Sequence, residues 1–132
     1  MATRSSLREK AMFGLYQYLL LKSDIRVILE DLCGKELKDI DPFILENVIE
    51  CLENKDELVS IINKNLKDWS FDRLGYIEQA ILLLATSEIT RGEIKKPIII
   101  NEAVELAKKY CDDDSYKFIN GVLDNLWVEL LV

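Results

Sequence analysis

The sequence contains no histidine. Because imidazole is the usual general base near neutral pH and a common metal ligand, this absence excludes Ser-His and Cys-His catalysis and histidine metal sites. The five scattered glycines form neither of the common phosphate-binding loops. Catalysis would have to depend on carboxylates or lysines alone, so we expect a protein that is not an enzyme and has no cofactor and no bound metal.

Cysteines and long apolar runs are also scarce. The three cysteines, Cys33, Cys51 and Cys111, are scattered and form no CxxC pair, which indicates reduced thiols rather than a disulfide framework. No apolar run approaches the roughly 18 residues that a membrane span requires, and the N-terminus lacks the apolar core of a signal peptide. We expect a cytoplasmic protein without a membrane segment, folded as a single helical domain over residues 1–132.

The charge balance is acidic but uneven. The chain carries 17 basic and 24 acidic side chains, a net charge of −7, whereas residues 1–22 carry four basic side chains against Glu9 alone. A net negative protein is unsuited to coating nucleic acid nonspecifically, because that binding depends on Lys and Arg. The basic N-terminus predicts either a local contact with an anionic partner or a short charge bias without function, and charge alone favours the second.

Apolar residues recur at helical spacing through nearly the whole chain, and no stretch alternates convincingly at period two. We predict an all-α fold of about seven helices, in two subbundles joined near Trp69. The first helix, about residues 4–22, is apolar around almost its full circumference, so we place it at the centre of the fold. A short second helix begins after Asp24 and ends near Gly34, and a third begins at Asp41-Pro42.

The second half of the chain predicts four more helices. The fourth extends roughly from Asp56 to Lys67, and the fifth begins at a Ser70 cap and ends before Gly92. Lys96-Pro97 and the three isoleucines that follow predict an extended linker, because the residue before proline avoids the helical region. Asn101 then caps a sixth helix. Asp112, Asp113 and Asp114 begin a seventh, where carboxylates complement the positive end of the helix dipole.

Phe118 falls outside the apolar stripe of the predicted last helix. That stripe consists of Ile119, Val122, Leu123, Leu126, Trp127 and Leu130. Phe118 lies about 110° from its centre, beside Lys117 and Asn125. An aromatic ring beside a lysine and an amide can stack on an unpaired base. The alternative is that Phe118 packs beneath a neighbouring helix or loop, and this helix alone favours the alternative.

Glu88 is the opposite anomaly, because it lies within about 20° of the centre of the apolar stripe of the fifth helix. A buried carboxylate is costly unless it is paired or hydrogen-bonded. It could be a general acid or base with a raised pKa, or a structural anchor bonded to a helix end or to a cation such as Arg73 or Arg8. No second carboxylate is patterned beside it, so the sequence favours the structural role.

Three longer segments can be compared with known families. The N-terminal SLREKAMFGLYQYLL and the later DRLGYIEQAILLLATSEI have the pattern of an opening and a fifth helix. The most specific segment is PIIINEAVELAKKYCDDDSYKFINGVLDNL, which contains INEAVELAK and SYKFINGVLD at the expected separation. Together these segments resemble the NusB family of bacterial transcription antitermination factors, and the resemblance extends over essentially the whole chain.

The resemblance implies an all-α fold of two three-helix subdomains around a central N-terminal helix, and no catalysis. Members of this family pair with NusE, which is also a small-subunit ribosomal protein. The pair binds the boxA element of nascent ribosomal RNA and, with NusA, NusG and RNA polymerase, suppresses premature termination. A homodimer is compatible with the resemblance, because some members dimerise and others do not.

The resemblance also implies functional positions, carried over residue by residue. Contacts with single-stranded RNA are implied at Arg4, Arg8, Tyr16, Tyr110, Asp114, Lys117 and Phe118. A contact with NusE is implied at Glu78. We expect the arginines to hold phosphates while Phe118 and Tyr110 stack on unpaired bases.

Two other interpretations are considered. Many family members carry two or three consecutive basic residues where this chain has Arg4-Ser5-Ser6. The alternative is therefore a protein-interaction module that keeps the fold without sequence-specific RNA binding. An enzymatic interpretation comes from RNA cytosine methyltransferases that carry a NusB-like domain at their N-terminus. We do not expect it, because the sequence up to Val132 has no cofactor-binding domain with a Gly-rich loop.

Overall fold

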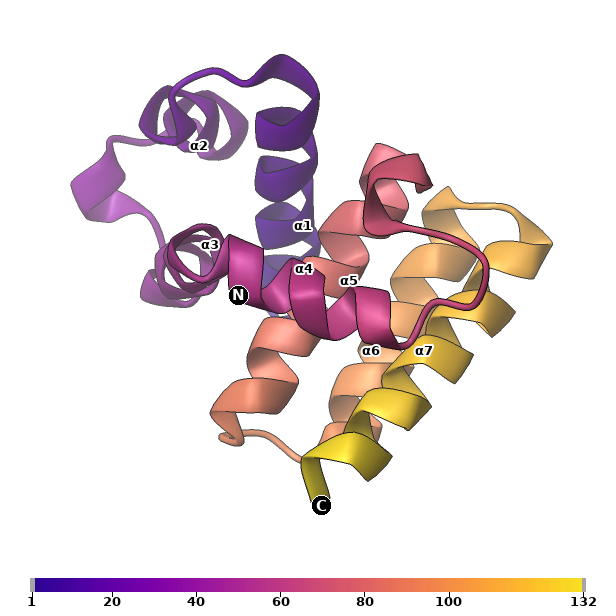
Figure 1. Ribbon diagram of the computed structural model, residues 1–132. Helices are drawn as coiled ribbons and strands as arrows, with labels where there is room; N and C mark the ends of the chain where they lie inside the picture. Colours follow the sequence, from indigo (N-terminus) through magenta and orange to yellow (C-terminus); the bar gives the residue numbers. More distant parts are fainter. Residues whose placement is uncertain (1, 132) are drawn as a thin grey trace.

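The computed structural model describes residues 2–131, and the side chains of residues 2–126 (Figure 1). Within that range the elements are all helical and no strand is present, which confirms the predicted fold class. The elements are α1 (Arg4–Leu21), α2 (Ile25–Cys33), η1 (Leu37–Asp39), α3 (Pro42–Glu53), α4 (Lys55–Lys64), η2 (Phe71–Arg73), α5 (Tyr76–Arg91), α6 (Lys96–Tyr110) and α7 (Asp113–Leu131). Among the described residues, no helix is long and apolar enough to cross a membrane.

Helices α1, α2 and α3 form one group (Figure 1), with α1 packed against both of the others. The predicted boundaries in this half are confirmed. Asp24 caps α2 by accepting from the backbone N–H of Arg26 at 2.9 Å. Gly34 ends the same helix with φ +65°, a conformation that glycine adopts without steric cost. Pro42 occupies the first turn of α3.

The second group consists of α5, α6 and α7, with α4 packed on α5 and α7 (Figure 1). Helix α5 also contacts α1 and α3, so it joins the two groups. Residues 79–89 of this helix are all buried, which explains why its sequence is apolar on nearly every side. On α7, the stripe residues up to Leu126 are buried as predicted; the side chains of Trp127 and Leu130 lie outside the described residues.

The predicted start of the fifth helix is wrong. Ser70 precedes the short helix η2 and makes no side-chain cap, and α5 begins five residues later, after Gly75. The buried amide of Gln79 explains the break, because its Nε2 donates to the carbonyl oxygens of Phe71 and Leu74 at 3.0 Å each. Those two carbonyls are thereby satisfied without a helix. Helix α4 likewise ends at Lys64, earlier than predicted.

The predicted linker at Lys96-Pro97 is also wrong. Helix α6 begins at Lys96, with Pro97 in its first turn, and Asn101 lies inside the helix rather than at its cap. Proline suits that turn because its missing N–H would have no helical partner there. The isoleucines after it belong to the helix, and Ile99 and Ile100 are buried.

Candidate nucleic-acid interface

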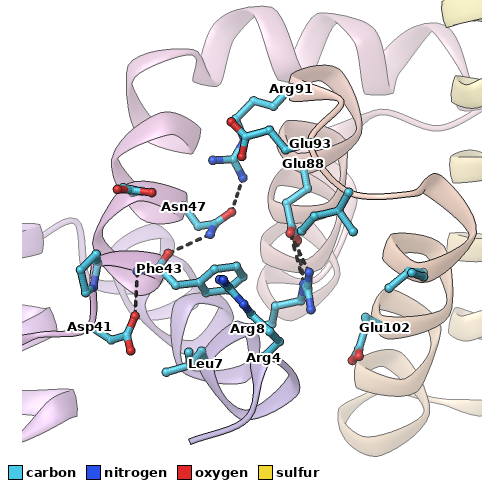
Figure 2. Close-up of a pocket in the computed structure, with 14 residues that line it drawn as sticks. Arg4, Leu7, Arg8, Asp41, Phe43, Asn47, Glu88, Arg91, Glu93 and Glu102 are labelled. Atoms are coloured by element: carbon cyan, nitrogen blue, oxygen red, sulfur yellow. Dashed lines mark hydrogen bonds and ion pairs between the residues drawn. The ribbon is translucent and has the colours of Figure 1, made fainter.

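Arg8 on α1 and Glu88 on α5 form a buried ion pair (Figure 2). Arg8 Nε donates to both carboxylate oxygens at 3.2 and 3.0 Å, and Nη2 donates to Oε1 at 3.0 Å. The structural interpretation of Glu88 is confirmed, with Arg8 as the cation. Arg8 is only 4% exposed, and its ion pair joins α1 to α5. Its contact with RNA stays a prediction.

Arg4 lies one turn earlier on α1 and is exposed. Its guanidinium carbon stands 4.4 Å from the centroid of the Phe43 ring, and that of Arg8 stands 5.3 Å from the same ring. Phe43 is fixed at the start of α3, where its N–H donates to Asp41 Oδ1 at 2.8 Å. A guanidinium stacked on a ring keeps its N–H edge available for a phosphate. Phe43 therefore holds Arg4 in a defined position.

These side chains line a pocket of about 790 Å³ between the two helix groups (Figure 2). Three arginines line it, Arg4, Arg8 and Arg91, against five carboxylates. The carboxylates belong to Asp41, Glu46, Glu88, Glu93 and Glu102. Because negative charge predominates, the interior of the pocket is unsuited to a phosphate chain. Arg4 is exposed, so an anionic group can approach it from outside the pocket.

The end of α6 is joined to α1 through Glu9. Tyr110 donates its hydroxyl to the Glu9 carboxylate, and Lys109 Nζ lies 3.0 Å from Glu9 Oε2. Tyr110 also packs edge-to-face against Phe13, with ring centroids 5.0 Å apart. The hydrogen bond from Tyr110, aided by Lys109, holds the pKa of Glu9 below its ordinary value, and the same bond raises the pKa of Tyr110. Tyr110 is thus half-buried with its hydroxyl bound.

Replacing Tyr110 with phenylalanine is expected to raise the pKa of Glu9 towards its ordinary value. The hydroxyl bond favours the carboxylate form, so its loss removes the main cause of the shift. Because the Glu9 pKa is lowered in the folded state, its contribution to stability is present above the unfolded pKa and is lost as pH falls through the folded pKa. NMR titration of the side-chain carboxyls measures the change; an unaltered Glu9 pKa in a folded variant would contradict this assignment.

The three α7 residues implied in RNA binding lie on two flanks of the helix. Phe118 and Asp114 line a hollow together with Trp69, Leu74 and other residues of the segment before α5. Lys117 lines a different groove, between α6 and α7, near the ring of Tyr116. Phe118 is half-buried against the core. Its ring is therefore neither fully covered by a neighbouring element nor fully exposed for stacking, so neither alternative for this residue holds in full. The structure brings Phe118 and Asp114 together but places Lys117 apart from them.

Glu78 lines the same hollow as Phe118. Its Oε1 accepts from the backbone N–H of Gly75 at 3.2 Å, so it also closes the first turn of α5. Burial first, then the charges of Glu78 and Asp112, raise the pKa of the Cys111 thiol to about 11. Tyr16 is half-buried on α1 against the core.

Two residues that lie beside the predicted RNA contacts were not predicted from the sequence. Phe43 follows the Asp41 cap and Pro42 in the first turn of α3, and it carried no signal of its own because its contact with Arg4 joins two helices. Trp69 was noted only as a junction, although it is 49% exposed and lines the hollow with Phe118. The available signal was its position between Lys67 and Arg73, because an aromatic residue among basic residues is typical of segments that bind single-stranded nucleic acid.

The fold and these surfaces define a class of protein: an all-helical binding protein of two joined helix groups, with arginine and aromatic side chains presented at α1 and α7. The sequence model of the NusB family matches residues 5–127, and the chain belongs to that family. A relative from Wolinella succinogenes, transcription antitermination protein NusB, is 41% identical over 132 residues, covering 98% of each chain.

Solved structures agree with this assignment. A chain in the crystal structure of a plectonemic RNA supercoil superposes with a TM-score of 0.88 at 30% identity, covering 100% of this chain and 99% of that chain. A chain in the crystal structure of antitermination factors NusB and NusE in complex with dsRNA gives 0.84 at 29% identity, covering 96% of each. The protein is thus similar over nearly its whole length to an antitermination factor of known structure.

Proposed function

We propose that this protein is a non-enzymatic, cytoplasmic antitermination factor that binds the boxA element of nascent ribosomal RNA together with NusE. In this role the whole chain acts as a single domain. It joins NusA, NusG and RNA polymerase in the larger complex that suppresses premature termination. The pairing with NusE and RNA is supported by the similarity to a NusB that was crystallised with both.

The observation that carries this proposal is the Arg4–Phe43 stack at the exposed start of α1. An arginine held 4.4 Å from a ring loses little conformational freedom when it binds a phosphate. The N-terminus is also where positive charge gathers on an otherwise acidic chain. One preorganised arginine therefore makes part of the phosphate contact that a longer run of basic residues would make.

The other residues take roles that fit their positions. Phe118 and Asp114 contact bases at the first turns of α7, and Glu78 contacts NusE at the start of α5. Arg8 helps to position Arg4, because both guanidinium groups pack on the Phe43 ring. Tyr16, Tyr110 and Lys117 contact the RNA at the edges of the site. Because the body is acidic, we expect weak RNA binding by this protein alone and tighter binding when a basic ribosomal protein adds cationic surface.

Replacing Arg4 with alanine is expected to flatten the salt dependence of RNA binding by about one phosphate contact. Fluorescence anisotropy with labelled boxA RNA over a salt series measures the slope. Lys10→Ala is the matched control, since Lys10 is an exposed cation on the same helix outside the site. An unaltered slope for Arg4→Ala would remove Arg4 from the phosphate contacts. Equal binding of boxA and scrambled RNA by the wild type would instead favour a protein-interaction module.

A further inference from the structure

We infer that the hollow beside Phe118 binds one unpaired RNA base, with Trp69 as a second stacking ring and Lys67 and Arg73 as phosphate contacts. We call it the Trp69 hollow; its main residues are Lys67, Trp69, Arg73, Glu78, Asp114 and Phe118. The inference rests on the proposed function and adds residues that neither the resemblance nor periodicity assigned.

The size and lining of the Trp69 hollow suit a base. Its volume is about 380 Å³, near the lower end of the roughly 300–1,000 Å³ typical of small-molecule sites. Trp69 is 49% exposed although tryptophan is usually well buried. Two aromatic side chains, Trp69 and Phe118, therefore face one concave surface, which is the arrangement that proteins use to stack unpaired bases.

The segment that carries Trp69 is anchored directly after the tryptophan. The Phe71 ring is 3% exposed, and the Phe71 N–H donates to Asn63 Oδ1 at 2.8 Å. The Gln79 amide holds the carbonyls of Phe71 and Leu74. Asp68, directly before Trp69, adopts a positive φ of 58°, an uncommon conformation for a residue other than glycine. The ring is thus presented by a fixed turn, which lowers the entropy lost on binding.

The charges of the Trp69 hollow favour a base inside and phosphates outside. Lys67 and Arg73 are exposed and have no side-chain hydrogen bond or ion pair with any residue that the structure describes. Glu78 and Asp114 place carboxylates in the same hollow. Carboxylates repel phosphate but accept hydrogen bonds from the amino groups of base edges. A base would therefore enter between the rings while its phosphates reach Lys67 and Arg73.

Continuity with the proposed RNA site favours RNA over a protein side chain as the occupant. Phe118 and Asp114, both proposed RNA contacts, form one wall of the Trp69 hollow. Glu78, the proposed NusE contact, lies in the same hollow and closes the first turn of α5. The RNA strand would then pass from Phe118 to Trp69 close to where NusE docks.

The test uses boxA RNAs in which one nucleotide at a time is made abasic, with the full-length protein and NusE. Trp69→Leu is expected to weaken binding of intact boxA about five- to hundredfold, the usual loss of one stacked base. One abasic position should weaken wild-type binding to a similar degree and cause no further loss in Trp69→Leu. Trp69→Phe, which keeps a ring, should retain most of the affinity.

The control is Tyr76→Leu, which removes an aromatic of similar exposure that does not line the hollow and should leave affinity unchanged. Abasic penalties that are the same in Trp69→Leu and the wild type would overturn the inference while leaving the proposed function intact. Weaker NusE binding by Trp69→Leu without RNA, together with uncoupled abasic penalties, would make the hollow a protein-docking site instead. Failure of the wild type to select boxA would overturn both.

Discussion

Replacing Glu88 with alanine is expected to lower the free energy of unfolding by about 3–5 kcal/mol, because it leaves the Arg8 guanidinium charged and buried without a partner. Both carboxylate oxygens accept from Arg8, and the two side chains are only 5% and 2% exposed. The pair also joins the two helix groups, so its loss should loosen α1 on α5. Urea unfolding followed by circular dichroism measures the change.

Two controls isolate the ion pair. Arg8→Met combined with Glu88→Met removes both charges at similar volume and should recover most of the stability, since buried pairs are often replaceable by apolar side chains. Glu46→Ala removes an exposed carboxylate and should change the unfolding free energy by less than about 0.5 kcal/mol. A Glu88→Ala variant as stable as Glu46→Ala would mean that the pair does not hold the helix groups together.

Replacing Phe118 with alanine is expected to weaken boxA binding by about 1–3 kcal/mol, the usual contribution of one stacked base. Phe118 is half-buried, so one part of the ring supports the core while the rest faces the hollow. Anisotropy with labelled boxA RNA, at a temperature where circular dichroism shows the variant folded, measures the loss.

The matched control is Val27→Ala, which shortens an exposed apolar side chain on α2, outside the proposed site. It should leave the affinity unchanged. Phe118→Tyr keeps a ring and should bind nearly as well as the wild type. A folded Phe118→Ala variant with wild-type affinity would remove Phe118 from the RNA site.

Much of the fold was predictable because local signals and burial agree. Asp24, Gly34, Asp41-Pro42 and Gly92 each mark a helix end that the structure confirms. The failures come from long-range or ambiguous signals. The start of α5 depends on a side-chain amide that satisfies two backbone carbonyls. Pro97 is compatible with a linker or a first helical turn, and the packing of Ile99 and Ile100 decides for the helix.

The candidate site was predictable only in part. Periodicity identified Glu88 as buried and left its partner open between a helix end and a cation such as Arg73 or Arg8, and the packing of α1 on α5 decides for Arg8. It also placed Lys117 and Phe118 together on an outer face, whereas neighbouring elements divide that face into two separate surfaces. The contribution of Phe43 depends on a contact between helices, which no local pattern reveals.

The most direct test of the central claim is fluorescence anisotropy with labelled boxA RNA and a scrambled control, with the protein alone and then with its NusE, at low and moderate salt. Our account predicts selective binding of boxA that becomes tighter when NusE is added. Equal or absent binding of both RNAs, while NusE still binds, would contradict it and leave a helical adaptor without RNA recognition.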